Sequence, residues 1–230
     1  MNILFIGNSY TYYNDLPEMF ASLCRANGED VRVDAVTGGG RHLYECLNLF
    51  GDDLKAGDGM ADRIAALMAE TEYDVLFLQD HSCLPILNPE AFLAGVVGLS
   101  SIVGAWRTAL YATWGRGDGS HTLEEHGWTR LSMTHALDRA YRAAAEYAHA
   151  EVSPVGYCFV AVADALPRVD LYDPDLSHPS YAGSCVAALA HYKTVFGEMP
   201  TDLSSLSLDA DTARALSAIV DATVMTDEEA

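Results

Sequence analysis

The chain has 230 residues and half of them are hydrophobic, which is enough apolar material for one α/β domain with a sizeable core. Its formal net charge of −20 argues against nucleic acid and anionic membranes as partners, because both are bound through positively charged surfaces. The five cysteines include no CxxC pair, so the sequence predicts buried free thiols rather than a disulfide framework or a zinc site.

Short apolar runs alternate with longer amphipathic segments, the pattern of a parallel sheet covered by helices. Three of the runs are apolar almost throughout, which indicates central strands that are buried on both faces. The sequence therefore predicts a three-layer α/β/α protein with a central, mostly parallel five-stranded sheet. The expected strands are Asn2–Ile6, Asp30–Val36, Asp74–Leu78, Thr108–Thr113 and Glu151–Gly156.

Helical patterns lie between and after these strands. The first follows Asn14 and Asp15, has Pro17 in its first turn and stops at Asn27-Gly28, which are ordinary helix start and stop signals. The expected helices are Leu16–Ala26, Met60–Glu70, Leu131–Ala150, Ser180–Phe196 and Asp209–Val224. In Leu131–Ala150, one face is expected to carry Leu131, Ala136, Ala140, Ala144 and Tyr147. The stretch Gly115–Trp128 is expected to be a long polar connection.

Ligands of open α/β sheets bind outside the carboxyl ends of the strands. Chemistry-bearing residues are therefore expected in the segments that leave those ends and in one further turn. These segments are Gly7–Tyr13, Thr37–His42, Gln79–Leu84, Trp114–Gly119 and Tyr172–Gly183.

Ser9 follows the first strand in the sequence Gly7-Asn8-Ser9. A serine at a strand-to-turn junction can expose its hydroxyl above the sheet edge and leave its own N–H available to an oxyanion. A helix-capping serine would occupy the same place, so the position alone does not separate nucleophile from cap. The G-x-S-x-G turn of α/β-hydrolases is absent, because Thr11 stands where the second glycine would be.

Asp175 and His178 lie three residues apart in a turn that ends in Pro179, at the start of a helix. This spacing can place the carboxylate against one imidazole nitrogen and leave the other nitrogen for a serine hydroxyl. The alternative is a helix-capping Ser180 beside an incidental histidine.

Two other segments carry groups that could bind an anion. Glycines 38–40 follow the second strand and could present backbone N–H groups, although they fit neither a P-loop nor a dinucleotide fingerprint and could form a simple turn. Gln79 follows the third strand and begins the polar run Gln79-Asp80-His81-Ser82, which could equally be a loop without chemistry. His121 and His126 are five apart, which is not the spacing of a helical metal-binding pair, so no metal site is predicted.

Together these segments resemble the sequence blocks of the SGNH/GDSL hydrolase superfamily. The first block, G-D-S, stands here as Gly7-Asn8-Ser9, the glycine of the second falls within residues 38–40, and the last, D-x-x-H-P, is intact from Asp175 to Pro179. The chain is most similar to a bacterial subfamily that reads I-G-N-S-[FY]-T near the start and H-P-S-x-x-G near the end. The resemblance spans residues 3 to 197.

The resemblance implies a flavodoxin-like fold in which residues 1–200 form the hydrolase domain and residues 201–230 add a helix and an acidic tail to it. It implies a serine esterase that hydrolyses a small, acetyl-like acyl ester, with a carbohydrate as one option for the alcohol. The implied catalytic triad is Ser9, His178 and Asp175, and the implied oxyanion and substrate-binding residues are Asn8, Gly39, Gly40 and Gln79. It implies no cofactor, and the expected partner is a small-molecule ester.

Two departures from the superfamily pattern leave alternatives open. The third block, G-x-N-D, normally supplies an oxyanion-binding Asn, and here Gln79 is the first substitute and His81 the second. Asn8 also replaces an aspartate beside the nucleophile. A binding protein with weakened catalysis, or an acyltransferase that uses the same triad, are the competing functions. A cytoplasmic location is expected, because the first residues lack a basic leader region and no apolar stretch reaches transmembrane length. Homo-oligomerisation stays open.

Overall fold

The computed structural model describes residues 1–47 and 59–225. Within these residues five strands form one sheet in the order β2-β1-β3-β4-β5, and every neighbouring pair is parallel. This confirms the predicted α/β class and the five-stranded sheet. The strands are β1 (Asn2–Gly7), β2 (Arg32–Thr37), β3 (Val75–Leu78), β4 (Arg107–Tyr111) and β5 (Glu151–Ser153).

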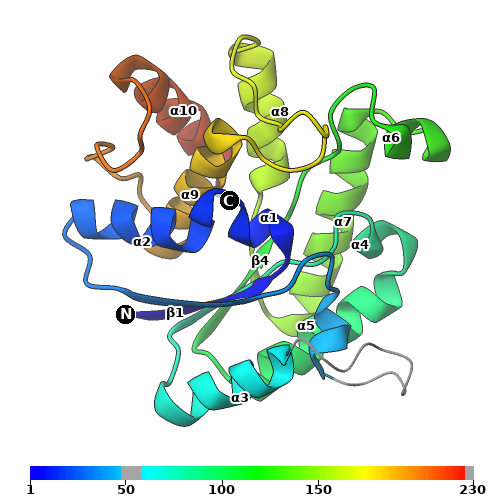
Figure 1. Ribbon diagram of the computed structural model, residues 1–230, viewed down its shortest axis with the longest axis vertical. Helices are drawn as coiled ribbons and strands as arrows, with labels where there is room; N and C mark the ends of the chain where they lie inside the picture. Colours follow the sequence, from blue (N-terminus) through cyan, green and yellow to red (C-terminus); the bar gives the residue numbers. More distant parts are fainter. Residues whose placement is uncertain (48–58, 226–230) are drawn as a thin grey trace.

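Helices cover both faces of the sheet, so the molecule has the predicted three layers (Figure 1). One side carries α2 (Leu16–Ala26), α8 (Val155–Ala165), α9 (Tyr181–Phe196) and α10 (Ala210–Thr223), and the other carries α3 (Met60–Glu70), α5 (Pro89–Val103) and α7 (Arg130–Ala148). The short elements are α1 (Ser9–Tyr12), α4 (Leu84–Leu87), α6 (His121–His126) and the 3-10 helices η1 (Tyr13–Asp15) and η2 (Leu43–Leu47).

Alternate residues of the strands enter two separate hydrophobic cores. In β1, Ile3 and Phe5 face the α2 and α9 side, whereas Leu4 and Ile6 face the α5 and α7 side. The ring of Phe5 stacks on Phe77 of β3, with centroids 4.6 Å apart. Since both faces of each central strand are buried, these strands need apolar residues at every position, which explains the near-continuous apolar runs.

The element predictions were wrong in four places. Residues Val155 and Gly156 begin α8 instead of ending the last strand. The helix α5 was not predicted, and the expected polar connection at residues 115–128 contains the short helix α6. The buried face of α7 carries Met133, Leu137 and Tyr141, whereas Leu131 and Tyr147, from the face expected to be shared with Ala144, are exposed.

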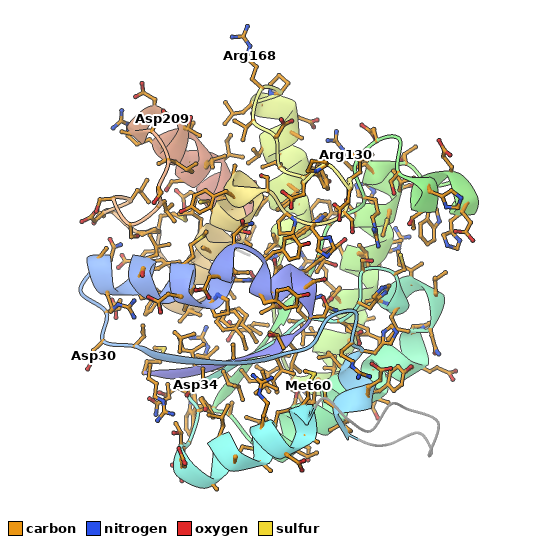
Figure 2. The ribbon with its side chains drawn as sticks, in the orientation of Figure 1. Asp30, Asp34, Met60, Arg130, Arg168 and Asp209 are labelled. Atoms are coloured by element: carbon orange, nitrogen blue, oxygen red, sulfur yellow. The ribbon has the colours of Figure 1, made fainter. Side chains whose placement is uncertain are left out.

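All strands point the same way, so their carboxyl ends meet at one edge of the sheet. Figure 2 shows Arg130, at the start of α7, on the side of this edge, and Asp30, which precedes β2, on the opposite side. All five cysteines are buried, as predicted. No helix within residues 1–47 and 59–225 is long and apolar enough to cross a membrane.

Candidate active site

Ser9 lies at the carboxyl end of β1, in the first turn of α1. The residue that caps this helix is Asn8, whose side-chain oxygen accepts a hydrogen bond from the Tyr10 N–H at 3.2 Å. Ser9 therefore does not act as the cap, and its hydroxyl is available for other contacts. The turn is tight because a Cβ atom on Gly7 would lie only 2.3 Å from the Thr11 hydroxyl oxygen, so glycine is required there.

His178 connects Ser9 to Asp175 through its two ring nitrogens. Its Nε2 atom lies 2.8 Å from Ser9 Oγ, and its Nδ1 atom lies 2.5 Å from Asp175 Oδ2. The other carboxylate oxygen of Asp175 accepts hydrogen bonds from the backbone N–H groups of Ser177 and His178, at 3.0 and 2.9 Å. The carboxylate is thus fixed by its own turn, and it in turn fixes the orientation of the imidazole.

The turn keeps Asp175 ionised although the carboxylate sits against protein. Desolvation raises the pKa of Asp175, but the hydrogen bonds from the His178 ring and from two backbone N–H groups outweigh it and hold the pKa below its ordinary value. Leu176 adopts a left-handed conformation with φ of 59° to close this turn. Such a conformation is unfavourable for leucine and is found where the surrounding structure enforces it, often at functional sites.

Two tyrosines enclose the imidazole of His178. The ring of Tyr13 stacks on it with centroids 4.1 Å apart and an interplanar angle of 11°, and Tyr10 meets it edge-on at 5.5 Å. The Tyr10 hydroxyl lies 2.8 Å from Ser177 Oγ, which ties this ring to the turn that carries Asp175. Both tyrosines line the cavity described next.

A cavity of about 390 Å³ opens beside Ser9 and His178 at the carboxyl edge of the sheet. Its other walls include Gly40 after β2, His81 after β3 and Arg116 after β4. All five segments expected to contribute to a site therefore meet at one cavity.

Comparison with solved structures identifies the family of this chain. It is 32% identical to a provisionally assigned SGNH hydrolase from Slackia heliotrinireducens, in a match that covers 85% of this chain and 98% of that one with a TM-score of 0.67. This chain belongs to the SGNH hydrolases. The sequence had predicted this family and its class of enzyme, an ester hydrolase.

Two more distant structures share the SGNH hydrolase fold. A DUF4886 family protein from Bacteroides uniformis is 16% identical, with a TM-score of 0.76 over 96% of this chain and 93% of that one. A catalytic mutant of an acetylxylan esterase from Geobacillus stearothermophilus is 14% identical, with a TM-score of 0.57 over 90% of this chain and 94% of that one. No protein-family model and no curated protein sequence matches the chain.

Gln79, expected to donate to the oxyanion in this SGNH hydrolase, has a different position. It is 1% exposed and does not line the cavity, and its Nε2 donates to Asn8 Oδ1 at 3.0 Å and to the Asp80 carbonyl. Its Oε1 accepts from the Asn8 N–H at 2.9 Å and from the Thr11 hydroxyl at 2.8 Å. Both amide hydrogens are engaged, so the side chain holds the turn that carries Ser9 and has no donor left for an oxyanion in this arrangement.

The other three predicted oxyanion and substrate-binding residues differ in their positions. Gly40 lines the cavity with φ of 66°, whereas Gly39 does not line it and instead faces the hydroxyl of Tyr12. Asn8 lines the cavity, but its side chain caps α1, accepts from Gln79 and donates to the Arg41 carbonyl at 3.0 Å. Its main contribution is to fix the conformation of the loop that carries Ser9.

His81 lies at the cavity with a neutral imidazole. Burial lowers the pKa of His81 to about 4, and electrostatic interactions with His42 and Arg116 act in the same direction. Next to it Asp80 is completely buried, where desolvation raises the pKa of the carboxyl while hydrogen bonds from His42 and from backbone N–H groups oppose that rise. The Asp80 carboxylate is shared between His42 Nδ1, at 3.3 Å, and the N–H groups of His81 and Leu43. This cluster fixes the backbone that presents His81.

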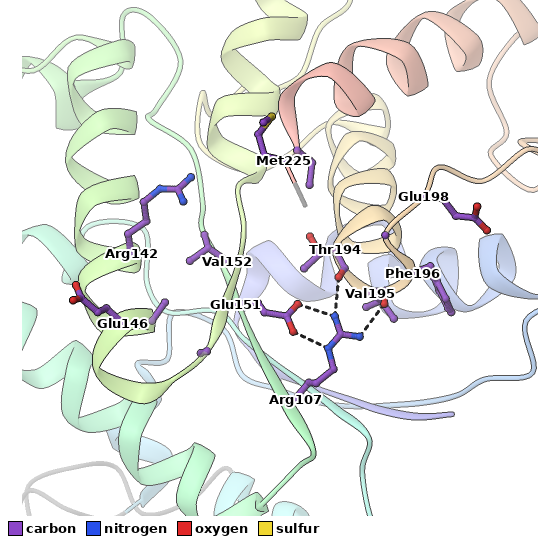
Figure 3. Close-up of a pocket in the computed structure, with 14 residues that line it drawn as sticks. Arg107, Arg142, Glu146, Glu151, Val152, Thr194, Val195, Phe196, Glu198 and Met225 are labelled. Atoms are coloured by element: carbon purple, nitrogen blue, oxygen red, sulfur yellow. Dashed lines mark hydrogen bonds and ion pairs between the residues drawn. The ribbon is translucent and has the colours of Figure 1, made fainter. Parts of the chain in front are cut away.

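A larger cavity of about 820 Å³ lies at the opposite edge of the sheet, where β4 and β5 begin (Figure 3). Its central side chain, Arg107, donates to both carboxylate oxygens of Glu151 at 2.7 Å and to the carbonyls of Val195 and Thr194. None of the residues that line this cavity is a histidine, a cysteine or a serine. Size therefore does not locate the chemistry in this protein.

Sequence reasoning missed Arg116 and Ser177 as cavity residues. Arg116 comes directly after the expected strand end, in Trp114-Gly115-Arg116, and it is one of only 13 basic residues in an acidic chain. A cation that follows the carboxyl end of a buried strand in so acidic a chain is the signal that could have identified it. Trp114, two residues before Arg116, is fully buried in the core.

Proposed function

We propose that this SGNH hydrolase is a serine esterase in which Ser9 attacks the carbonyl of a small acyl ester. The observation that carries the proposal is the continuous hydrogen-bonded series from Ser9 through His178 to Asp175 at the wall of a cavity. Serine, histidine and carboxylate in this order are the arrangement that activates a hydroxyl nucleophile, whichever fold carries it.

In the proposed mechanism His178 Nε2 takes the proton from Ser9 as the new C–O bond forms, and then gives it to the leaving alcohol. Asp175 remains ionised and stabilises the imidazolium that forms in between, consistent with its lowered pKa. Stacking against the electron-rich face of Tyr13 favours the same cationic state. A water molecule then repeats the sequence on the acyl-enzyme and releases the acid.

Three donors are proposed to bind the tetrahedral oxyanion. Among the backbone hydrogen bonds of the described residues, none uses the N–H of Ser9 or of Gly40, and both residues line the cavity. The neutral imidazole of His81 carries one N–H and makes no hydrogen bond to another described side chain, so we assign it the third position in place of Gln79. Each such donor typically contributes about a hundred- to a thousandfold to the rate.

The proposed acyl group is small. The cavity of about 390 Å³ is near the lower end of ligand-site volumes, and its walls are polar and aromatic side chains rather than an apolar tunnel. An acetylxylan esterase with the same fold supports an acetyl group on a carbohydrate as the first substrate to examine.

The test is turnover of a small aryl acetate by the purified chain, with and without an added alcohol as acyl acceptor. Release of acetate to water supports the esterase. Acetylation of the alcohol in preference to water would replace it with an acyltransferase. Absence of turnover, together with absence of labelling by a fluorophosphonate, would leave a binding protein that kept the fold.

A further inference from the structure

Arg116 is placed in the catalytic cavity without a negatively charged partner. Its Nη2 atom donates to Ser82 Oγ at 2.8 Å, and Ser82 is a neutral hydroxyl. No carboxylate of the described residues forms an ion pair with this guanidinium, and its Nε atom is buried with no hydrogen-bond partner among them. A guanidinium has five N–H donors, so the described residues leave most of its hydrogen-bonding capacity unused.

The nearby carboxylates are already engaged elsewhere. Asp175 is held by His178 and by its own turn, and Asp80 is held by His42 and by backbone N–H groups. In a chain with 33 acidic and 13 basic residues, an arginine that faces a cavity without an acidic partner is unexpected as a purely structural feature.

The backbone around Arg116 is fixed from both sides. The Gly115 N–H donates to the hydroxyl of Thr134 on α7 at 2.9 Å, and the Gly117 N–H donates to the Leu176 carbonyl at 2.8 Å. Leu176 belongs to the turn that carries Asp175 and His178. Arg116 is therefore anchored to the same turn as the proposed general base, and its charge is held in a defined place relative to the triad.

We propose that Arg116 binds an anionic group of the substrate, a carboxylate that the ester carries in addition to its scissile bond. This inference rests on the proposed esterase function of the same cavity. Arginine is suited to this role because its planar fork can donate two parallel hydrogen bonds to a carboxylate, a geometry that gives specificity as well as affinity. The neighbouring His81 is neutral and adds no repulsion or second cation. The substrate class is thus esters of carboxylate-bearing acids or alcohols.

The experiment compares matched substrates that differ only in one charge. For a carboxylate on the alcohol side the pair is 4-acetoxybenzoate and 4-acetoxybenzamide. For a carboxylate on the acyl side it is the 4-nitrophenyl monoester of glutarate and the corresponding glutaramate ester, with spontaneous hydrolysis subtracted. We expect the native protein to prefer the anionic member of one pair by roughly ten- to a hundredfold in kcat/KM, as a charged hydrogen-bonded contact would give.

Variants identify the group responsible. Arg116→Gln should bring the anionic-to-neutral ratio close to one, and Arg116→Lys, which keeps the charge without the fork, should give an intermediate ratio. Arg142→Gln is the matched control, because it removes one positive charge from an exposed position that pairs with Asp138 at the opposite end of α7. It should leave the ratio unchanged.

Some outcomes would overturn the inference while the esterase proposal stands. They are turnover of both pairs with no preference, or a preference that survives in Arg116→Gln. An equal loss on both members in Arg116→Gln would also overturn it, since it would mean that Arg116 stabilises the oxyanion. If Arg116→Gln does not fold, the anionic-to-neutral ratios of kcat/KM in the native protein and in Arg116→Lys test the inference.

Binding separates failure of the inference from failure of the esterase proposal. In the Ser9→Ala variant, titration calorimetry should show tighter binding of 4-acetoxybenzoate than of 4-acetoxybenzamide if the charge preference is on the alcohol side. The glutarate pair gives the corresponding test for the acyl side. Equal affinity within both pairs would contradict the inference whether or not the native protein turns over esters.

Discussion

The two edges of the sheet each present a cavity that contains an arginine, and they differ in what the arginine touches. At the amino edge Arg107 is saturated, with a two-pronged contact to Glu151 and two backbone carbonyls (Figure 3). At the carboxyl edge the Arg116 guanidinium, in the cavity that Ser9 and His178 also line, donates to only a neutral hydroxyl among the described residues. In the larger cavity every guanidinium nitrogen of Arg107 donates to a protein group, whereas in the smaller cavity the described residues leave most donors of Arg116 without an acceptor. Donors without a protein acceptor are what we expect of a binding site rather than of a structural cleft. Changes at the carboxyl edge should therefore affect turnover, and changes elsewhere should affect stability.

The largest effect is expected at the nucleophile and the general base. Ser9→Ala and His178→Ala should each lower kcat for an aryl acetate by roughly ten-thousandfold or more, and the double variant should be no slower, because the two residues act as a unit. Steady-state kinetics measures this. Ser22→Ala on α2, whose hydroxyl pairs with Glu18 and Arg25 on the same helix, is the control and should keep native kinetics. Turnover that survives in Ser9→Ala would remove Ser9 from the mechanism.

A somewhat smaller effect is expected for Asp175→Asn. The variant keeps the shape of the side chain but loses the charge that stabilises the imidazolium, so kcat should fall by about a hundred- to ten-thousandfold. We expect a fall in kcat near the hundredfold end of this range, because the Asp175 side chain is 47% exposed and water can replace part of the lost interaction. The comparison variant is Asp173→Asn, two residues away in the same segment. If Asp173→Asn were the more harmful change, the triad would have to be redrawn.

The third prediction separates His81 from Gln79. His81→Ala should lower kcat by about a hundredfold with KM and melting temperature little changed, as expected for a donor that acts mainly in the transition state. Gln79→Ala should lower the melting temperature as well as kcat, because it removes three buried hydrogen bonds to the turn that carries Ser9 and a fourth to the Asp80 carbonyl. Parallel kinetic and thermal-unfolding measurements distinguish the two. If Gln79→Ala lowered kcat without lowering the melting temperature, and His81→Ala left kcat unchanged, the oxyanion role would belong to Gln79.

His191, buried in the core between the two edges of the sheet, should make the free energy of unfolding depend on pH. His191 lies among Phe5, Phe77 and Tyr111 with its Nδ1 2.8 Å from Ser153 Oγ, and burial lowers the pKa of His191 to about 3. An unfolded histidine titrates near ~6.5, so between these values the unfolded chain binds the extra proton and stability falls as the pH falls. His191 should contribute a loss of roughly 2 kcal/mol between pH 7 and pH 5, and nothing further above pH 7.

Urea unfolding at several pH values measures this contribution. His191→Leu should flatten the dependence between pH 7 and pH 5 by about one proton, whereas His121→Gln at an exposed position of α6 should leave it as in the native protein. An unchanged slope in His191→Leu would mean that His191 is not held neutral in the folded state.

The smallest effect is expected at the amino edge. Arg107→Gln should reduce the free energy of unfolding by about 1 kcal/mol, since the ion pair with Glu151 is one-third exposed and such pairs contribute modestly. Ester turnover should stay as in the native protein. A selective loss of turnover in Arg107→Gln would mean that the two edges of the sheet are coupled and that the amino edge also affects turnover.

The parts predicted from sequence are those in which local order determines the outcome. The strand positions followed from apolar runs, and Ser9, Asp175 and His178 followed from short motifs whose place at the carboxyl edge is fixed by a parallel topology. Helix α5 was not predicted, because its sequence is apolar on nearly all sides and so shows no helical periodicity of apolar and polar residues. It also packs closely on the Leu43 region through Gly95, which no local pattern reveals.

Contacts between segments distant in the chain could not be predicted in the same way. Gln79 and Asn8 are 71 residues apart, and whether the amide faces the cavity or the nucleophile turn depends on how β1 and β3 pair. Arg116 becomes conspicuous only when the carboxylates around it are seen to be engaged by other groups. Both are questions of tertiary hydrogen bonding rather than of sequence pattern.

The most direct test of the central claim is to locate the covalent bond that a fluorophosphonate forms with the protein. The labelled chain is digested and the modified peptide is sequenced by mass spectrometry. We expect one adduct, on Ser9. It should form rapidly in the native protein and at least a hundredfold more slowly in His178→Ala, since the histidine must accept the serine proton. An adduct on another residue, or labelling of Ser9 at the same rate without His178, would contradict that claim.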